Sequence, residues 1–563
     1  MISTLRQRIT HASAVLAAAG SLALDDPTWF AVQAGRTLPA PVRTRLGTVV
    51  GRSGSTTLAA WGHLLMDQPA AARELLSTGR HGRLGDALAL HAGLPPSSDS
   101  ASHAARWGWL TGDLATAGSA ATDSSARQRR RALGDIAALE PGPRPAPPAV
   151  RTWAADGTPH VLHVLTNSLP WTRSGYTMRS HDILTSQQLA GLAVTAMTRP
   201  GYPATIGKWR SGPQDTLDGI TYHRSMPLPM HPGEAERVDQ WAADLVALAS
   251  REQVTHLHST THYPTGLAAQ SAATALGLPW VHEVRGQLER TWASRRANAG
   301  DPDPYASGRY ALWRAREAEV AAAADHVITL SGPMRADLIA RGVAADRITV
   351  VPNGIGEEVL DLPEDAAGVR EQDGLPREGI WVGAVTSVVH YEGLSVLLEA
   401  VALARAAGTD VRAAIVGDGL AWPELARQVE RLGLTDVVHL PGRLPRPQAR
   451  RWLARLDVVA VPRQRHEVTQ LVPPLKVMEA MGAGRPVIVS ALPALTEIVS
   501  DGHTGLVVNP GAPQELAQAV QRLATDDALR RSLTEAGRQQ ARLHTWPKLV
   551  DRYQQIYREV SRA

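Results

Sequence analysis

A lysine and a glutamate three residues apart mark the chemically most informative segment of the chain. Lys476 and Glu479 follow Pro473 and Pro474 and precede a Gly-x-Gly-x-Pro run, so we expect a loop, a short helix beginning near Pro474, and a strand. Residues at this spacing project from one face of a helix. A lysine beside the free N–H groups of a first helical turn can bind an anion, while the carboxylate can accept hydrogen bonds from vicinal hydroxyls. The diphosphate and ribose of a nucleotide match this pair; the alternative is a surface ion pair worth about a few tenths of a kcal/mol.

Two blocks of alternating strands and helices must position these side chains. Short apolar runs separated by amphipathic stretches predict an α/β fold with two doubly wound parallel sheets. The strands are expected at residues 160–166, 193–198, 255–258, 280–284, 326–330 and 348–351, and then at 380–385, 411–416, 437–440, 458–461, 487–490 and 505–508. Ligands of such sheets bind at the carboxyl ends of the strands, so with two domains we expect the site in the cleft between them.

The remaining sequence predicts a third, all-helical part. Residues 1–140 are rich in Ala, Leu and Arg with helical spacing, and a Pro-rich linker follows at 141–155. The segment 107–115 resembles the first helix of a tetratricopeptide-like hairpin, which leaves a peptide-binding repeat array open beside a plain helical accessory domain. The expected domains are 1–140 (helical), 156–360 and 375–545 (Rossmann-like), with a C-terminal helix at 546–563 that crosses back to the first Rossmann-like domain.

Composition excludes several classes of protein. The 563 residues carry a formal net charge of +4 with mixed signs, so no nucleic-acid-binding field is expected. The chain has no Cys, which removes disulfides and thiolate metal sites and fits a cytoplasmic protein. The apolar run 12–24 resembles a signal-peptide core, but Asp25 and Asp26 before Pro27 favour a helix end, and no run is long enough to span a membrane. Only Lys208, Lys476 and Lys548 are lysines, so Lys476 stands out among 58 basic residues.

Three segments resemble a phosphate-binding loop or a metal site but do not match the known motifs. Residues 47–53 approximate a phosphate-binding loop but lack the fourth spacer residue and the lysine. Residues 301–303 read Asp-Pro-Asp without a strand to present them, which indicates a turn. His256, His258 and His262 have no carboxylate at metal-ligand spacing, so we expect no metal site.

Ordered motifs in both blocks show a family resemblance. From about residue 160 to 563 the chain resembles the retaining glycosyltransferases of family 4, which have the two-Rossmann-domain GT-B fold, and it is closest to the branch with a Tyr-Glu-Gly signature and a Pro-Leu-Lys-x-x-Glu motif. The segments that carry the resemblance are 382–394 (with Tyr391, Glu392 and Gly393), 167–181, 198–203, 282–286, 350–355, 461–463 and 473–490.

The resemblance implies a nucleotide-sugar donor, UDP- or GDP-linked, and no cofactor or metal. Arg463 and Lys476 would neutralise the diphosphate as it leaves, and Glu479 would hold the ribose. Gly175, in the loop after the first strand, would let the backbone approach the phosphates. Thr496 and Glu497, in a loop before a helix, would lie near the phosphates or the sugar.

The chain departs from the family pattern at three places. Leu471 occupies the position of the first glutamate of the usual pair eight residues apart. Tyr391 and Glu392 replace a phosphate-binding lysine, which leaves the positive charge to Arg463 and Lys476. Where relatives place a histidine near the reacting sugar, this chain has Glu283 and Arg285; Arg285 would position a sugar or acceptor, or would pair with Glu283 or Glu289.

We therefore expect a cytoplasmic or inner-membrane-face retaining glycosyltransferase that makes glycans, cell-envelope polysaccharide or glycoconjugates. Its acceptor would be a hydroxyl of a glycan, a lipid-linked sugar or a small molecule. Residues 1–140 are left open as a surface for a partner protein, a second copy or peripheral membrane contact. Two alternatives remain: a non-catalytic sugar-nucleotide-binding scaffold whose helical domain recruits partners, and an epimerase of the same fold.

Overall fold

The computed structural model describes residues 2–66, 68–79, 82–149, 151–154 and 157–562. The chain divides into two compact units. Unit 1 contains residues 1–327, 341–347 and 556–563, and unit 2 contains residues 328–340 and 348–555. None of the described helices is both long and apolar enough to span a bilayer.

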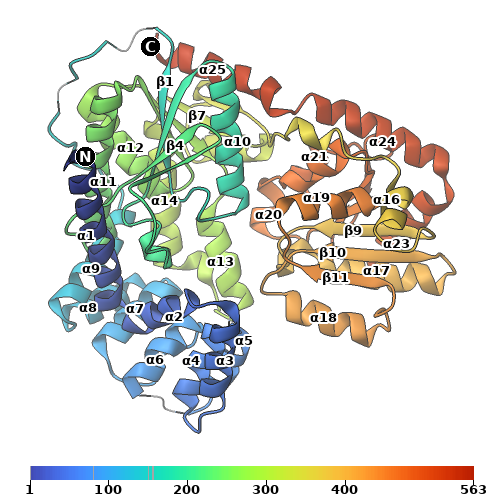
Figure 1. Ribbon diagram of the computed structural model, residues 1–563, viewed down its shortest axis with the longest axis horizontal. Helices are drawn as coiled ribbons and strands as arrows, with labels where there is room; N and C mark the ends of the chain where they lie inside the picture. The colour runs from blue at the N-terminus through green and yellow to red at the C-terminus, as the bar shows by residue number, and fades with distance from the viewer. Residues whose placement is uncertain (1, 67, 80–81, 150, 155–156, 563) are drawn as a thin grey trace. The chain divides into compact units, whose positions relative to one another are not determined.

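Every regular element that the structure describes in the N-terminal part of unit 1 is a helix (Figure 1). Its helices are α1 (Ile2–Asp25), α2 (Pro27–Arg36), α3 (Ala40–Gly51), α4 (Thr56–Leu65), α5 (Pro69–Leu76), α6 (Gly82–His91), α7 (Ala101–Thr111), α8 (Leu114–Thr122) and α9 (Ala126–Leu139). Side-chain caps begin several of them, as where Asp26 accepts a hydrogen bond from the backbone N–H of Trp29 ahead of α2. The segment 107–115 is not one helix, because α7 ends at Thr111 and α8 begins at Leu114. It is the turn of a hairpin between these two helices.

Two contacts attach this helical part to the sheet that follows. Helix α9 packs on α11 (Glu234–Glu252) where Gly134 meets Gly233, so closely that a Cβ on Gly134 would lie 2.7 Å from the Cα of Gly233. Nearby, the guanidinium of Arg309 in α14 (Gly308–Ala323) lies over the ring of Trp109 at 4.2 Å, and over two further tryptophan rings of unit 1, those of Trp292 and Trp313. The close approach of Gly134 and Gly233 holds α9 against the sheet domain. The contact of Arg309 with the ring of Trp109 holds α7 there.

The first sheet has the strand order β3-β4-β2-β1-β5-β6-β7-β8. Its strands are β1 (His160–Leu165), β2 (Ala193–Thr198), β3 (Gln214–Leu217), β4 (Ile220–Arg224), β5 (His256–Thr260), β6 (Trp280–Val284), β7 (His326–Thr329) and β8 (Ile348–Val350). The other helices of this region are α10 (Gly175–Leu189), α12 (Tyr263–Leu276), α13 (Leu288–Asn298) and α15 (Gly332–Ala340). Figure 1 shows α10 on one side of the strands and α11 and α12 on the other.

The expected strands of this sheet are confirmed to within two residues, and one hairpin was not foreseen. β3 pairs with β4 in the antiparallel sense, whereas the pairings of β1 with β2 and β5 are parallel. The hairpin turns at Asp218 and Gly219, both with positive φ (50° and 79°). An Asp-Gly pair is a strong hairpin signal, so the sequence held the evidence for this turn.

The second sheet, wholly in unit 2, is parallel throughout its described pairings, with the order β11-β10-β9-β12-β13-β14. Its strands are β9 (Ile380–Val385), β10 (Val411–Val416), β11 (Val438–Gly442), β12 (Val458–Val461), β13 (Val487–Ser490) and β14 (Leu506–Val508). Its helices are α16 (Ala366–Gln372), α17 (Leu394–Ala406), α18 (Trp422–Arg431), α19 (Arg446–Arg455), α20 (Glu467–Leu471), α21 (Leu475–Gly482), α22 (Pro493–Thr496), α23 (Pro513–Thr525) and α24 (Asp527–Arg542).

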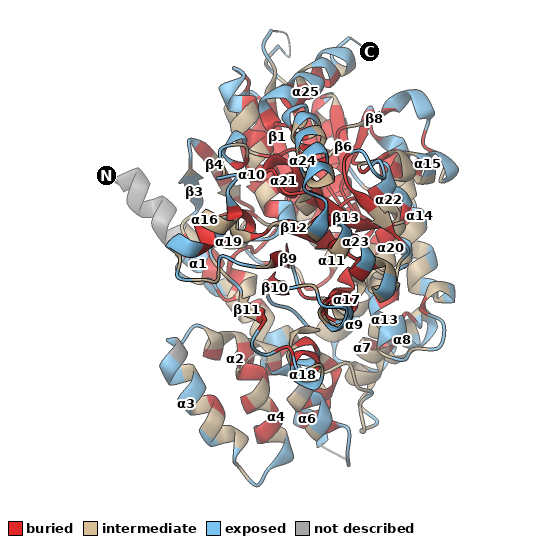
Figure 2. Ribbon diagram, turned by 90° about the vertical axis from the view of Figure 1, so that its right-hand side faces the viewer, coloured by how far each residue is buried: buried red, intermediate tan, exposed pale blue. Residues whose placement is uncertain are grey.

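Both faces of the second sheet are covered, as its apolar strands require. Along β9, Val382 and Ala384 join a core with α17 and α23, while Trp381 joins a separate core with α19 and α21. Figure 2 shows the strands buried and the outer sides of the surrounding helices exposed. The sequence-based expectation of two parallel-sheet, Rossmann-like domains after a helical region is confirmed.

The last helix, α25 (Trp546–Val560), contributes to both compact units, because the boundary falls at Ile556. In its final turns Tyr557 is buried in unit 1. The hydroxyl of Tyr557 accepts a hydrogen bond from Gln187 at 2.9 Å and lies 2.6 Å from Nδ1 of His258. The end of the chain thus closes the core of the first sheet.

Candidate active-site residues

Three polar side chains lie together where β9 and β12 end and α21 begins. Thr386 follows β9, Arg463 follows β12, and Lys476 stands in the first turn of α21, which begins one residue after Pro474 as expected. The strand order of the second sheet reverses between β9 and β12, with β10 on one side and β13 on the other. Ligands of open α/β sheets bind at such a switch point.

Glu392 joins the two cations of this group. Its carboxylate accepts a hydrogen bond from Nη2 of Arg463 at 2.8 Å and is ion-paired with Nζ of Lys476, which also donates to Oγ1 of Thr386 at 2.7 Å. Arg463 donates in addition to the backbone oxygen of Val472 at 2.9 Å. We call Thr386, Glu392, Arg463 and Lys476 the switch-point cluster. It comes from segments up to 90 residues apart.

The electrostatics of the cluster follow from burial and charge together. Glu392 is 4% exposed, and although burial alone would raise its pKa, Arg463 and Lys476 hold it at about 2. Burial lowers the pKa of Lys476 to about 8, against the attraction of Glu392. At neutral pH the cluster therefore contains two cations and one carboxylate, which leaves one positive charge for an incoming anion.

Gly393 explains how Glu392 reaches this position. Its φ is +69°, and a Cβ there would lie 1.9 Å from the backbone oxygen of Pro462. The loop after β9 can therefore press against the end of β12, which brings the preceding carboxylate onto Arg463. The sequence indicates that Tyr391 and Glu392 replace a phosphate-binding lysine, which implies only the loss of a positive charge at Glu392. In the structure Glu392 is the shared partner of the two cations.

The other residues expected in unit 2 lie at the edges of this group. Glu479 is half-buried on α21, one turn after Lys476, and its charge helps to raise the lysine pKa. Leu471 ends α20, and its backbone oxygen accepts a hydrogen bond from Ser331. Thr496 and Glu497 are exposed at the end of the short helix α22, not in a loop before a helix as expected, because the chain turns helical already at Pro493. Oε1 of Glu497 accepts a hydrogen bond from the backbone N–H of residue 332 at 2.8 Å.

Glu283 and Arg285, the residues expected near the reacting sugar, form a buried ion cluster in unit 1. Oε2 of Glu283 lies 2.7 Å from Nη2 of Arg285, and Oε1 lies 2.7 Å from Nη2 of Arg179 on α10. All three residues are less than 5% exposed. Burial would raise the pKa of Glu283, but the two arginines hold it well below its usual range. Glu289 pairs instead with Arg341 at 2.9 Å.

Gly175, His256 and His258 lie in unit 1. Gly175 is the first residue of α10, after the capping residue Ser174, and no described atom lies within 4 Å of where its Cβ would be. His258 is a core residue whose Nε2 lies 3.3 Å from Glu283. His256 and His258 both contact Tyr557. Among the described residues no three His, Asp or Glu side chains are grouped so that they could hold a metal ion.

The lookalike motifs have structural roles. Residues 47–53 lie at the end of α3, not between a strand and a helix. Asp301 pairs with Arg296, whose Nη2 lies 2.8 Å from its carboxylate, and Asp303 caps the 3₁₀ turn Pro304–Ala306.

Comparison with known proteins gives the class of this chain. The family model described as "Glycosyl transferase 4-like domain" matches residues 174–354, and the model described as "Glycosyl transferases group 1" matches residues 377–526. The two matches cover one sheet domain each and together span more than half of the chain. The chain is therefore a glycosyltransferase, and the non-catalytic scaffold weighed from the sequence is not favoured. It belongs to family 4 of these enzymes and has their GT-B fold.

Individual relatives agree with this assignment. The chain is 27% identical over 423 residues to the D-inositol 3-phosphate glycosyltransferase of a Nocardioides species, covering 70% of this chain and 88% of the relative. It is 28% identical over 356 residues to the alpha-maltose-1-phosphate synthase of Mycolicibacterium smegmatis, covering 60% and 87%. Among solved structures, Anabaena HepE in complex with UDP has a TM-score of 0.54 at 20% identity, covering 72% of this chain and 100% of that chain. Sucrose-phosphate synthase from Thermosynechococcus elongatus has a TM-score of 0.56 at 20% identity, with 72% and 99% coverage. At such identities the solved structures show the fold alone.

Proposed function

We propose that this glycosyltransferase takes a sugar from a UDP- or GDP-sugar and transfers it to a hydroxyl acceptor with retention of configuration, without a metal ion. The observation that carries the donor assignment is the switch-point cluster, whose two cations share one carboxylate beside a helix start. A diphosphate binding there would meet Arg463 and Lys476 together with the N–H groups of the first turn of α21. The relative that was solved with UDP supports the choice of nucleotide.

The same residues supply the chemistry that the leaving group needs. As the bond between the anomeric carbon and the phosphate oxygen breaks, negative charge grows on the diphosphate, and the fixed guanidinium and ammonium groups stabilise it. Glu479, one turn further along α21, is placed to accept hydrogen bonds from the ribose hydroxyls. In the front-face reaction that we propose, the departing phosphate takes the proton of the acceptor hydroxyl, so no protein base is needed. Gly175, Glu283, Arg285, Thr496 and Glu497 remain proposed contacts of the donor or the transferred sugar.

Donor hydrolysis tests this function. The purified chain should release nucleotide slowly from at least one member of a panel of UDP-, GDP- and ADP-sugars, with added EDTA making no difference. Lys476→Ala should abolish both release and the thermal shift given by the nucleotide. Lys548→Ala is the matched control, because Lys548 is an exposed lysine of the same unit.

Two results would contradict the proposal. One is the absence of nucleotide release and thermal shift with the whole panel, and the other is unchanged nucleotide affinity in Lys476→Ala. Retention is tested separately, once an acceptor is in hand, from the anomeric configuration of the product by NMR.

A further inference from the structure

One segment of the helical part has basic and apolar residues but no carboxylate. Residues 27–66, which form α2, α3 and α4, contain four arginines and no Asp, Glu or Lys. The whole chain has 54 Asp and Glu among 563 residues, about one in ten, and residues 27–66 are its longest run without one. Figure 2 shows α3 at the edge of the helical part, beside α4 on which it packs. The segment therefore gives this edge a positive charge of its own, although the chain as a whole is nearly neutral.

Exposed valines and arginines alternate along one face of α3. Residues at intervals of three and four share this face of the helix and its C-cap, and we call them the α3 face: Val42, Arg45, Val49 and Arg52. Val42 is 49% and Val49 is 71% exposed, and both arginines are exposed. Elsewhere α3 packs closely on α4, since a Cβ on Gly62 would lie 2.7 Å from the backbone oxygen of Gly47. The contact with α4 thus fixes the orientation of α3 and leaves the α3 face to solvent.

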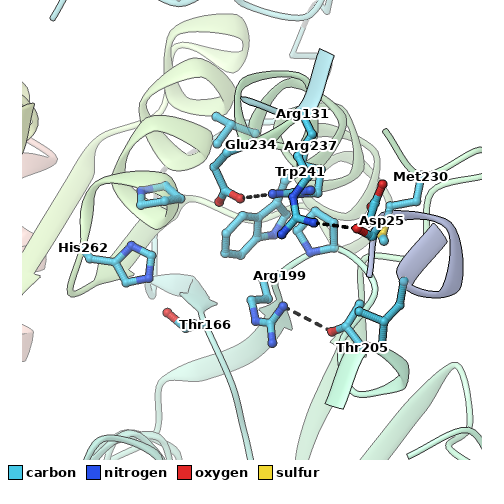
Figure 3. A pocket seen from close by; sticks show the side chains of 14 residues that line it. Asp25, Arg131, Thr166, Arg199, Thr205, Met230, Glu234, Arg237, Trp241 and His262 are labelled. Carbon is cyan, nitrogen blue, oxygen red and sulfur yellow. Dashed lines mark hydrogen bonds and ion pairs between the residues drawn. The ribbon is translucent and has the colours of Figure 1, made fainter. Parts of the chain in front are cut away.

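The two arginines of the α3 face have no counter-charge within the described chain. The guanidinium groups of Arg45 and Arg52 make no hydrogen bond or ion pair with any residue that the structure describes, and α4 has no carboxylate to offer them. Other arginines of unit 1 do have such partners. In the cavity that Figure 3 shows, for example, Arg237 is ion-paired with Glu234. The positive charge of the α3 face is therefore available to an external anionic surface.

The size and charge of the α3 face decide what kind of partner it fits. Helix α3 has 12 residues and is about 18 Å long, so one face of it is far smaller than the roughly 800 Å² that each partner buries in a stable protein interface. Two copies of the chain that met symmetrically through this face would bring arginines against arginines. A lipid bilayer needs no matching partner surface, because apolar side chains enter the headgroup layer while arginines contact the lipid phosphates.

We propose that the α3 face docks unit 1 on a membrane surface rich in anionic phospholipid, with Val42 and Val49 in the headgroup layer and Arg45 and Arg52 on lipid phosphates. Each arginine near such a surface should strengthen binding about fivefold, so the attachment is reversible and weakens with salt. The helical part would thereby hold the enzyme at a membrane. This inference goes beyond the proposed transfer reaction and does not depend on it, because docking needs neither donor nor acceptor.

The test is flotation of the purified full chain with lipid vesicles, without any nucleotide sugar. Vesicles of equal parts phosphatidylglycerol and phosphatidylcholine are the probe, and vesicles of phosphatidylcholine alone are the neutral control. The chain should bind the anionic vesicles about tenfold or more tightly than the neutral ones, and high salt should remove the difference. Replacing Arg45 and Arg52 together by Gln should weaken binding about twenty-five-fold. The matched control replaces Arg210 and Arg295, two exposed arginines of unit 1 outside α3, and should change binding much less.

A second pair of variants tests the apolar part of the α3 face. Val49→Asp places a carboxylate between the two arginines and should abolish vesicle binding, whereas Leu16→Asp makes the same change of charge at a 73% exposed residue of α1 and should largely preserve it. Both residues are exposed, so the variants should keep the thermal unfolding midpoint of the parent chain. The proposal is overturned if the chain binds neither kind of vesicle or both equally, if the two double arginine variants bind alike, or if Val49→Asp binds as tightly as Leu16→Asp. Absence of vesicle binding would leave the α3 face to a soluble acidic partner.

Discussion

The titration of Lys476 predicts that nucleotide affinity falls steeply above neutral pH. Because burial lowers the lysine pKa to about 8, the ammonium that should meet the diphosphate loses its proton within an accessible pH range. If only the charged form binds, the fraction competent to bind falls from about nine-tenths at pH 7 to about one-tenth at pH 9, so the dissociation constant for UDP should rise about tenfold. An ordinary exposed lysine would stay charged over the whole range and would give no such change.

Calorimetric titration of UDP at pH 7, 8 and 9 measures this effect. At pH 8 about half of the lysines must gain a proton when the diphosphate binds, so titrations in two buffers of different ionisation enthalpy should show an uptake of up to about half a proton. Lys476→Arg is the decisive variant, because its side chain stays charged throughout and should give a flat profile without proton uptake, whatever its affinity at pH 7. The exposed Lys548→Arg should keep the steep profile.

Three results would refute the reasoning: equal UDP affinity at pH 7 and pH 9 in the parent chain, binding at pH 8 without proton uptake, or the same steep profile in Lys476→Arg. The first two would mean that Lys476 is not the titrating partner of the diphosphate. The third would assign the pH dependence to another group.

Other predictions concern stability. Glu392→Gln should lower the free energy of unfolding by about 3 kcal/mol at pH 7, because two buried cations lose their counter-charge. The pKa of Glu392 in the folded chain is about 2, below its ordinary value of 4.5. The stabilisation that the Glu392 carboxylate provides is therefore complete above pH 4.5 and is lost as the pH falls through 2. Urea unfolding of the parent chain and of Glu392→Gln should give the same free energy of unfolding at that low pH. Gly134→Val should lower the free energy of unfolding by about 1–3 kcal/mol, because its Cβ would meet the backbone of Gly233. The change should be seen as a lower midpoint of thermal unfolding. Gly118→Ala is the control and should not destabilise the chain, because the nearest atom to its new Cβ, on Ile136, lies 3.9 Å away. Arg309→Gln should also lower the midpoint of thermal unfolding. It removes three cation–aromatic contacts, which together should contribute about 1–2 kcal/mol to the free energy of unfolding.

Strands such as β9 and β12 could be predicted from the sequence because these buried parallel strands are continuous apolar runs. The β3–β4 hairpin escaped the same reasoning, since it lies at the sheet edge and Gln214 and Asp215 interrupt its apolar pattern. Its signal was the Asp218-Gly219 turn and not hydrophobicity.

The candidate site was predictable where chemistry is local and unpredictable where the fold brings distant residues together. Lys476 could be identified from one short segment that predicts a helix start. Its pairing with Glu392, 84 residues earlier, depends on how the loop after β9 packs against β12, and nothing in the local sequence encodes that contact.

The position of Glu392 bears on how often the enzyme can complete a cycle. A site with two unopposed cations would hold a nucleoside diphosphate tightly and release the spent product slowly, and product release limits the rate of many enzymes. A carboxylate already seated between Arg463 and Lys476 competes with the diphosphate for the same hydrogen bonds. In the donor site that we propose, Glu392 would weaken the hold on the product while keeping both cations in place for the next donor, which would favour rapid turnover.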